Sequence, residues 1–325
     1  MMKRRTFLAF AAAAPALSAP PAMDLGKIPI RRVGKVETVF KSPGPQPNGL
    51  QATKDGLWIM DQGAGNKAYL VSYEDGKVLR SFETETDKSS GITFDGEALW
   101  IGSTYSREII RADAKTGETI EKHFTPGAGV IYRRTTDTPP RPDTYGQSVR
   151  GARGGGAAGE GGGTRGGGAP GAARQGGAGG RRQATSDGLG VGRGGAVAGN
   201  PGPPAPGTGA HGQQTQGGRL WIAVPPGRMI YRIDPKTWMV EHMFPTVGYR
   251  PHGIGIETPD AKYLWESDTN MGAFFKRDMM TCEVVDSIVL AEGTPFPHGA
   301  SVWKGYLYWV DDIGGGHAPV CRVKI

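Results

Sequence analysis

The sequence contains only two cysteines, Cys282 and Cys321, among its 325 residues, so a scaffold built on several disulfide bonds is excluded. Its apolar runs are short. After the N-terminal segment none approaches the ~20 apolar residues that a membrane-spanning helix needs, and we expect no membrane span. Glycine and proline are abundant instead, with 54 and 25 residues. That is too many for an ordinary globular protein of this length, which indicates that they gather in one segment.

Residues 1–22 have the composition of an export signal. They begin with Lys3, Arg4 and Arg5, continue with an alanine-rich apolar run and end in small residues. The arginine pair and the weak hydrophobicity of the run favour the twin-arginine route, with a chance arginine pair in a general secretory signal as the alternative. We therefore expect a periplasmic or secreted protein.

Residues 130–208 form a Gly/Arg/Pro-rich insertion. Its few apolar side chains cannot offset the entropy lost on ordering, which predicts a disordered segment. It carries ten arginines and four acidic residues, so with the signal it accounts for more than the formal net charge of +7 and leaves about −2 for the rest. Arg-Gly-rich segments can bind RNA, but export argues against a nucleic-acid partner, and we expect a solvated loop.

Outside this insertion the chain repeats. Five stretches align on a leading glycine and a following aromatic residue: NGLQATKDGLWIMDQ, SGITFDGEALWIGST, HGQQTQGGRLWIAVP, HGIGIETPDAKYLWESD and HGASVWKGYLYWVDD. Nine positions separate the two residues in four units, as from Gly49 to Trp58, and twelve separate Gly253 from Trp265. A second hairpin with an Asp-Gly or Thr-Gly type of turn follows the aromatic residue, so each unit predicts four strands, a to d.

Residues 34–325 are therefore predicted to form one all-β domain, a five-bladed β-propeller with the insertion between blades 2 and 3. Without the insertion each unit has about 43 residues, within the ~40 to 45 typical of a four-stranded blade. The fifth unit lacks its last strand, and residues 34–40 resemble residues 76–82. The N-terminal strand is thus expected to close the last blade, while a sixth, degenerate blade inside the insertion stays open.

Propeller geometry predicts where chemistry is concentrated, because the residues that open strand a and close strand b meet at one mouth of the central channel. The openings are Asn48, Ser90, His211, His252 and His298. The closings include Asp61, Ser103, Asp268 preceded by Glu266, and Asp311 with Asp312. His317 is a candidate fourth imidazole at this mouth. The recurring Trp58, Trp100, Trp221 and Trp265 are expected to be core residues between blades.

Three converging imidazoles suit either of two chemistries. His211, His252 and His298 are predicted ligands of one divalent metal ion of unknown identity, with nearby carboxylates orienting them. Without metal, a histidine beside a carboxylate is a general base near neutral pH. The structural alternative is that each His-Gly pair locks its blade by hydrogen bonding. Glu266 is conspicuous, since Ile59, Ile101 and Ile222 occupy the same repeat position.

The phrases GITFDGEALWIGS and PNGLQATKDGLWIMD resemble the repeat of streptogramin (virginiamycin B) lyases and of the related YncE-like and gluconolactonase-like propellers. The resemblance implies ring opening of a cyclic ester by elimination, with a histidine as base and acidic residues holding Mg²⁺. By motif, it places His252 and His298 as candidate bases and Glu266 near the metal. The lyases have seven units where this chain has five.

Two functions follow from the sequence. The first is an exported, metal-assisted lyase or hydrolase that acts on an ester, lactone or sugar-derived ring. His252, His298 and Glu266 are then catalytic, and the predicted substrate-binding residues are Asn48, Ser90, Asp61, Asp268 and Asp311. The second is a non-catalytic propeller that binds a peptide, a glycan or a partner protein. We expect a monomer with a small-molecule or carbohydrate ligand.

Overall fold

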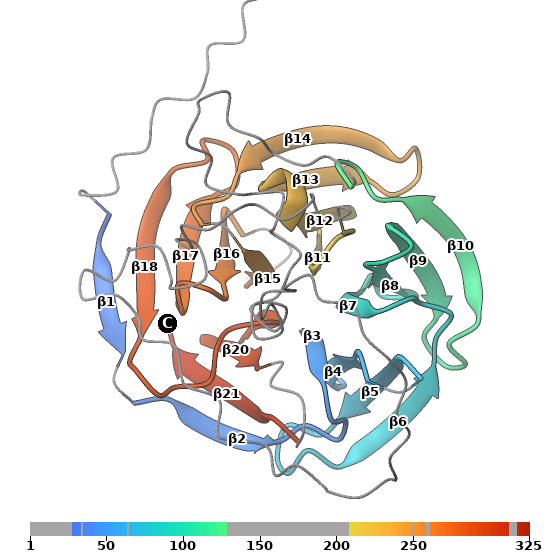
Figure 1. Ribbon diagram of the computed structural model, residues 1–325, viewed down its shortest axis with the longest axis horizontal. Helices are drawn as coiled ribbons and strands as arrows, with labels where there is room; N and C mark the ends of the chain where they lie inside the picture. The colour runs from blue at the N-terminus through green and yellow to red at the C-terminus, as the bar shows by residue number, and fades with distance from the viewer. Residues whose placement is uncertain are drawn as a thin grey trace, which may run out of the picture.

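A computed structural model describes residues 28–325, except 34, 64, 129–207, 249, 258–260 and 312–316. Within these residues, 21 β-strands form five sheets that stand radially around one axis (Figure 1). The predicted export signal and nearly all of the predicted insertion lie outside the described residues. No helix in the described part of the chain is long and apolar enough to cross a membrane.

Each sheet is one blade, with the first-named strand nearest the axis. Blade 1 comprises β3 (Pro47–Thr53), β4 (Gly56–Asp61), β5 (Lys67–Val71) and β6 (Val78–Glu83). Blade 2 comprises β7 (Ser89–Phe94), β8 (Ala98–Ser103), β9 (Glu108–Asp113) and β10 (Thr119–Phe124). Blade 3 comprises β11 (Gly212–Gln216), β12 (Arg219–Val224), β13 (Met229–Asp234) and β14 (Met239–Pro245), with a 3₁₀ turn at Pro225–Gly227.

Blade 4 comprises β15 (Pro251–Ile256), β16 (Tyr263–Asp268), β17 (Ala273–Asp278) and β18 (Val284–Leu290). Blade 5 comprises β19 (Ala300–Trp303), β20 (Tyr306–Val310), β21 (Pro319–Lys324) and the N-terminal β2 (Glu37–Lys41). The predicted five-bladed propeller, closed by a strand from the N-terminal side, is therefore confirmed. Pairing of the two ends of the domain satisfies two sheet edges that would otherwise be exposed.

One strand was not predicted. β1 (Ile30–Val33) pairs in parallel with the outer strand β18 and extends blade 4 to five strands (Figure 1). The Arg31 guanidinium donates to the Asp286 carboxylate at 2.6 Å and helps to hold β1 in place. The chain thus contributes to two adjacent blades before it enters blade 1.

The leading glycine of each repeat is required because neighbouring inner strands approach closely. A Cβ atom on Gly91 would lie 2.5 Å from the carbonyl oxygen of His211, and one on Gly299 would lie 2.6 Å from that of Asn48. The remaining contacts of this kind join Gly49 to Ser90, Gly212 to His252 and Gly253 to His298. They run from blade to blade and return to blade 1. Blades 2 and 3 touch directly, which leaves no place between them for a sixth blade.

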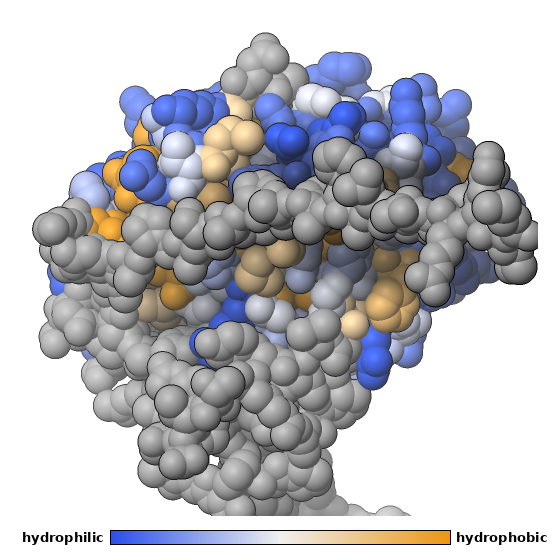
Figure 2. Space-filling model, turned by 90° about the horizontal axis from the view of Figure 1, so that it is seen from above, coloured by the Kyte–Doolittle hydropathy of each residue, from blue (hydrophilic) through white to orange (hydrophobic). Residues whose placement is uncertain are grey.

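The core lies between the blades. Trp58, for example, packs with Ile92 and Leu99 of the next blade. The repeated tryptophans are 1–3 % exposed, which confirms their predicted place in the core: Trp58, Trp100, Trp221 and Trp265. Seen edge-on, the described surface mixes hydrophilic residues with scattered apolar ones (Figure 2).

Candidate functional site at the propeller axis

The residues that open the inner strands sit at β-bulges. In blade 4, the four residues of β15 from Pro251 to Ile254 face three residues of β16, from Asp268 to Glu266, so the ladder shifts around His252. In blade 5, the N–H of His298 donates to the Val310 carbonyl and the Val310 N–H donates to the Gly299 carbonyl, so two residues face one. A bulge re-aims the side chain of its extra residue.

Three of the five opening residues are histidines, and the structure brings their imidazole rings together. The ring centroids of His252 and His298 are 3.9 Å apart, and those of His211 and His252 are 4.4 Å apart. His252 and His298 are almost fully buried, whereas His211 is partly exposed. Residues from three blades, separated by up to 87 positions in the chain, therefore form one axial histidine cluster, defined as His211, His252 and His298.

His252 stands at the centre of this cluster. Burial is the main cause that holds its pKa well below the ordinary 6.5, and repulsion from His298 and His211 if they were charged acts in the same direction. Neither ring nitrogen of His252 has a hydrogen-bond partner within the described residues. A buried polar group without a partner is costly, and such groups are rare in native structures unless they serve a function or bind a ligand. His252 is thus neutral at pH 7 and available as a proton acceptor.

The other two openings complete the ring without imidazoles. The Ser90 hydroxyl donates to Oδ1 of Asn48 at 2.8 Å and lies 3.3 Å from the carbonyl oxygen of His211. Both side chains are buried. Outside the cluster, Oγ1 of Thr208 lies 3.0 Å from Nε2 of His211, and Nδ1 of His317 lies 2.8 Å from the carbonyl oxygen of Ser42. His317 is exposed, and this hydrogen bond joins it to the connection between β2 and β3.

The predicted substrate-binding aspartates are engaged by the backbone. Their carboxylates accept N–H bonds of 2.7–2.9 Å from residues two positions before an opening residue. The pairs are Gln46 with Asp61, Arg250 with Asp268 and Phe296 with Asp311. In blade 2 the Ser103 hydroxyl accepts from the N–H of Asp87, three positions before Ser90. These side chains fix the connections that lead into the inner strands, and Asp312 lies outside the described residues.

Burial raises the pKa of two of these carboxyl groups. The pKa of Asp61 is raised, although N–H bonds from Gln46 and Gly63 oppose the shift. The pKa of Asp268 is raised to about 6, since desolvation outweighs the N–H bond from Met271. Asp268 therefore changes its charge near neutral pH while it holds the segment that precedes His252.

Glu266 forms a buried ion pair with Arg277. Nη1 of Arg277 lies 2.9 Å from Oε2 of Glu266, and both side chains are 1 % exposed. The same guanidinium donates to the carbonyl oxygens of Pro245 and Cys282, while Glu266 accepts the N–H of Val247. Burial raises the pKa of Glu266 and the attraction of Arg277 opposes that shift. This pair ties blade 4 to the end of blade 3.

Arg277 was not among the predicted site residues, although the repeat contains the signal. Arg277 lies opposite Leu264 in the ladder, and the corresponding residues in the other blades are Val71, Ala112, Ile233 and Val323. Glu266 likewise occupies a site that is isoleucine in blades 1 to 3. Two charges at two otherwise apolar repeat positions of one blade indicate a pair.

A shared metal ion does not fit the cluster as the rings lie. Imidazoles around one tetrahedral zinc ion would have ring centres roughly 5 Å apart. At 3.9 and 4.4 Å the rings of His211, His252 and His298 pack against one another instead. Among the described residues, no group of three or more His, Cys, Asp or Glu side chains is arranged to hold a metal ion.

Comparison with protein-family models and with curated proteins finds no match. Among solved structures, the chain is similar to glutaminyl cyclase from Myxococcus xanthus, with 9 % identity and a TM-score of 0.49 over 92 % of this chain and 100 % of that one. It is also similar to a streptogramin B lyase, with 14 % identity and a TM-score of 0.43 over 90 % and 87 % of the two chains. Hydrazine synthase from Kuenenia stuttgartiensis matches at 15 % identity and a TM-score of 0.29 over 36 % and 32 %.

At such identities, the side chains at the axis have to be judged by their own geometry.

Proposed function

We propose that the protein is an exported propeller enzyme that opens an ester, lactone or sugar-derived ring by proton transfer at the axial histidine cluster. The observation that carries the proposal is His252, a buried neutral imidazole with no hydrogen-bond partner among the described residues and with a second imidazole 3.9 Å away. A neutral imidazole near the reacting atoms is the usual general base at neutral pH.

The proposed roles divide between two rings. The lone pair of His252 takes a proton from the carbon next to the activated C–O bond. The electrons of that C–H bond form a C=C bond, and the C–O bond breaks to release a carboxylate or alkoxide. An N–H of His298 supplies the proton that an alkoxide product needs, and the protonated His252 returns a proton to His298, so both rings end neutral. In a hydrolase, His252 would instead take the proton of a water molecule that attacks the carbonyl carbon.

The surrounding groups position these rings. Asp268 holds the N–H of Arg250, two residues before His252, and Asp311 holds the N–H of Phe296, two residues before His298. Because catalysis falls steeply when reacting groups move by about 1 Å, these two aspartates are proposed to act through the backbone rather than on the substrate. Glu266 has the same kind of role through Arg277.

The experiment uses the mature protein and a panel of nitrophenyl esters, lactones and cyclic depsipeptides. We expect turnover of at least one class, with a new ultraviolet absorbance if a C=C bond forms and with acid release alone if the ring is hydrolysed. His252→Asn and His298→Asn should each lower kcat by about 10²-fold or more. His242→Asn on the outer strand β14 is the matched control and should keep the wild-type rate.

Two outcomes would reject the enzyme. One is the absence of turnover across the panel. The other is unchanged turnover in both axial variants. If those variants lose thermal stability and nothing else, the cluster is a structural lock in a binding propeller. Export is tested separately by N-terminal sequencing of the protein recovered from the periplasm or medium, where removal of about the first 22 residues is expected.

A further inference from the structure

A cavity of about 960 Å³ opens at the end of the propeller opposite the histidine cluster. It is lined by the turns that join the inner strands to their neighbours, such as 53–55 and 94–97. His252 lies four positions before Ile256 at the cavity, which is about 13 Å along a β-strand. The cavity is thus a different site from the one proposed above.

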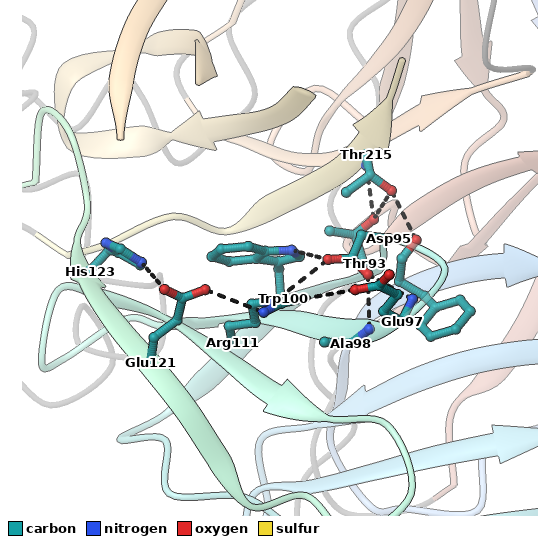
Figure 3. Close-up of polar contacts among 10 residues, drawn as sticks. Thr93, Asp95, Glu97, Ala98, Trp100, Arg111, Glu121, His123 and Thr215 are labelled. Atoms are coloured by element: carbon teal, nitrogen blue, oxygen red, sulfur yellow. Dashed lines mark hydrogen bonds and ion pairs between the residues drawn. The ribbon is translucent and has the colours of Figure 1, made fainter. Parts of the chain in front are cut away.

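The inner strands present hydrogen-bonding side chains to this cavity, and most of them are satisfied by the neighbouring blade. The Thr93 hydroxyl accepts the N–H of Thr215 at 2.9 Å, and the Thr215 hydroxyl donates to the Phe94 carbonyl at 2.9 Å (Figure 3). Gln51 accepts the N–H of Phe94. These bonds tie blades 1, 2 and 3 together.

Gln214 is the exception. Its side chain lines the cavity and is 6 % exposed, and its Oε1 atom has no hydrogen-bond partner within the described residues. A buried acceptor without a hydrogen bond has lost its water and gained no partner, which costs free energy. A ligand that donates a hydrogen bond to it therefore gains affinity. The atom therefore calls for a ligand with an N–H or O–H donor.

Two arginines that line the cavity already have acidic partners. Arg111 lies between Asp95 at 3.6 Å and Glu121 at 3.6 Å, and its guanidinium stands over the ring of Trp100 (Figure 3). Arg219 pairs with Glu241 at 2.8 Å outside the cavity. A charged ligand would have to compete with these pairs, whereas a neutral one would not.

Apolar surface completes the lining. Trp303 borders the cavity, and its ring lies parallel to that of Tyr73 with centroids 6.2 Å apart. Val302 and Ile256 also belong to the lining. An aromatic ring in the same lining as amide and hydroxyl groups suits a ligand that has both C–H faces and O–H donors.

We propose that this cavity binds a neutral saccharide, with a hydroxyl group donating to Oε1 of Gln214 and a sugar face on Trp303. The site is independent of the axial histidine cluster. It gives the protein a place to hold a carbohydrate whether or not the axis is catalytic.

The test is calorimetric titration of the mature protein with neutral trisaccharides built from glucose or N-acetylglucosamine. We expect at least one to bind in the millimolar range or tighter. Gln214→Met keeps the size and removes the acceptor, and it should weaken binding about tenfold, as should Trp303→Ala. Gln213→Met is the matched control, because the adjacent buried Gln213 also has an unpartnered Oε1 but does not line the cavity.

Thermal melting of each variant establishes that it is folded, and His252→Asn should bind as the wild type does, which separates this proposal from the enzymatic one. The proposal is overturned if no neutral trisaccharide binds saturably, if a uronic-acid sugar binds in preference, or if the folded Gln214→Met and Trp303→Ala proteins bind like Gln213→Met.

Discussion

Replacing only one member of the Glu266–Arg277 pair is expected to lower the free energy of unfolding more than replacing both members together. In Arg277→Val, Glu266 stays 1 % exposed without its cation, and the carbonyls of Pro245 and Cys282 lose their donor. Breaking a buried pair in this way costs about 3–5 kcal/mol. Glu266→Ile leaves Arg277 buried with the two carbonyls only, and a loss of similar size follows.

The double variant Glu266→Ile, Arg277→Val restores the apolar composition of the corresponding positions in blades 1 to 3. It leaves no uncompensated charge, so it should be more stable than Arg277→Val alone, with a coupling energy of at least about 2 kcal/mol. Urea unfolding of the four proteins gives this energy. The exposed pair Arg322–Glu37 is the control, and Arg322→Val there should cost under about 1 kcal/mol. Additivity of the two buried variants within about 0.5 kcal/mol would refute the reasoning.

Three further predictions concern the axis. Gly253→Ala would place a Cβ atom 2.7 Å from the carbonyl oxygen of His298, so its midpoint of urea unfolding should fall. The fall should be larger than that of Gly305→Asn, which lies at an open turn. Equal midpoints would contradict the close packing. Because burial raises the pKa of Asp268 from 3.8 to about 6, the native state binds its proton more tightly, and this stabilisation is lost as pH rises from about 4 through 6. Asp268→Asn should therefore remove about 3 kcal/mol of that pH dependence in unfolding experiments, and an unchanged profile would contradict it. The predicted metal ion is tested by metal analysis, in which a stoichiometric divalent ion lost in His252→Asn would support it and a metal-free, fully active protein would reject it.

The sequence was sufficient for the propeller because its repeat is periodic. The spacing from Gly49 to Trp58 recurs, and the pattern of 34–40 matches that of 76–82, so blade number and ring closure both follow. Convergence of the opening residues followed from topology alone. The β1 strand has no counterpart in the repeat, and a four-residue segment that pairs in parallel leaves no alternating pattern to detect.

The hydrogen bonds and the ion pair at the site could not be predicted from the sequence. The bulges, which recur from blade to blade, place Asp61, Asp268 and Asp311 against backbone N–H groups, and only the register of each ladder reveals that. Glu266 was noticed as an acid in an apolar position, but its partner Arg277 lies on the next strand and was not compared across blades. The cavity near Gln214 depends on side-chain packing at the far turns, which no repeat position encodes.

The proposed chemistry requires His252 to lie neutral among converging imidazoles at the axis. Nitrogen-15 NMR of the histidine rings, with His252→Asn to assign the signal, measures this protonation state directly. We expect His252 to keep the chemical shifts of a neutral ring at pH 6, below the ordinary pKa of 6.5, while a solvent-exposed histidine is largely protonated. A His252 signal that titrates with a midpoint near 6.5 would contradict it.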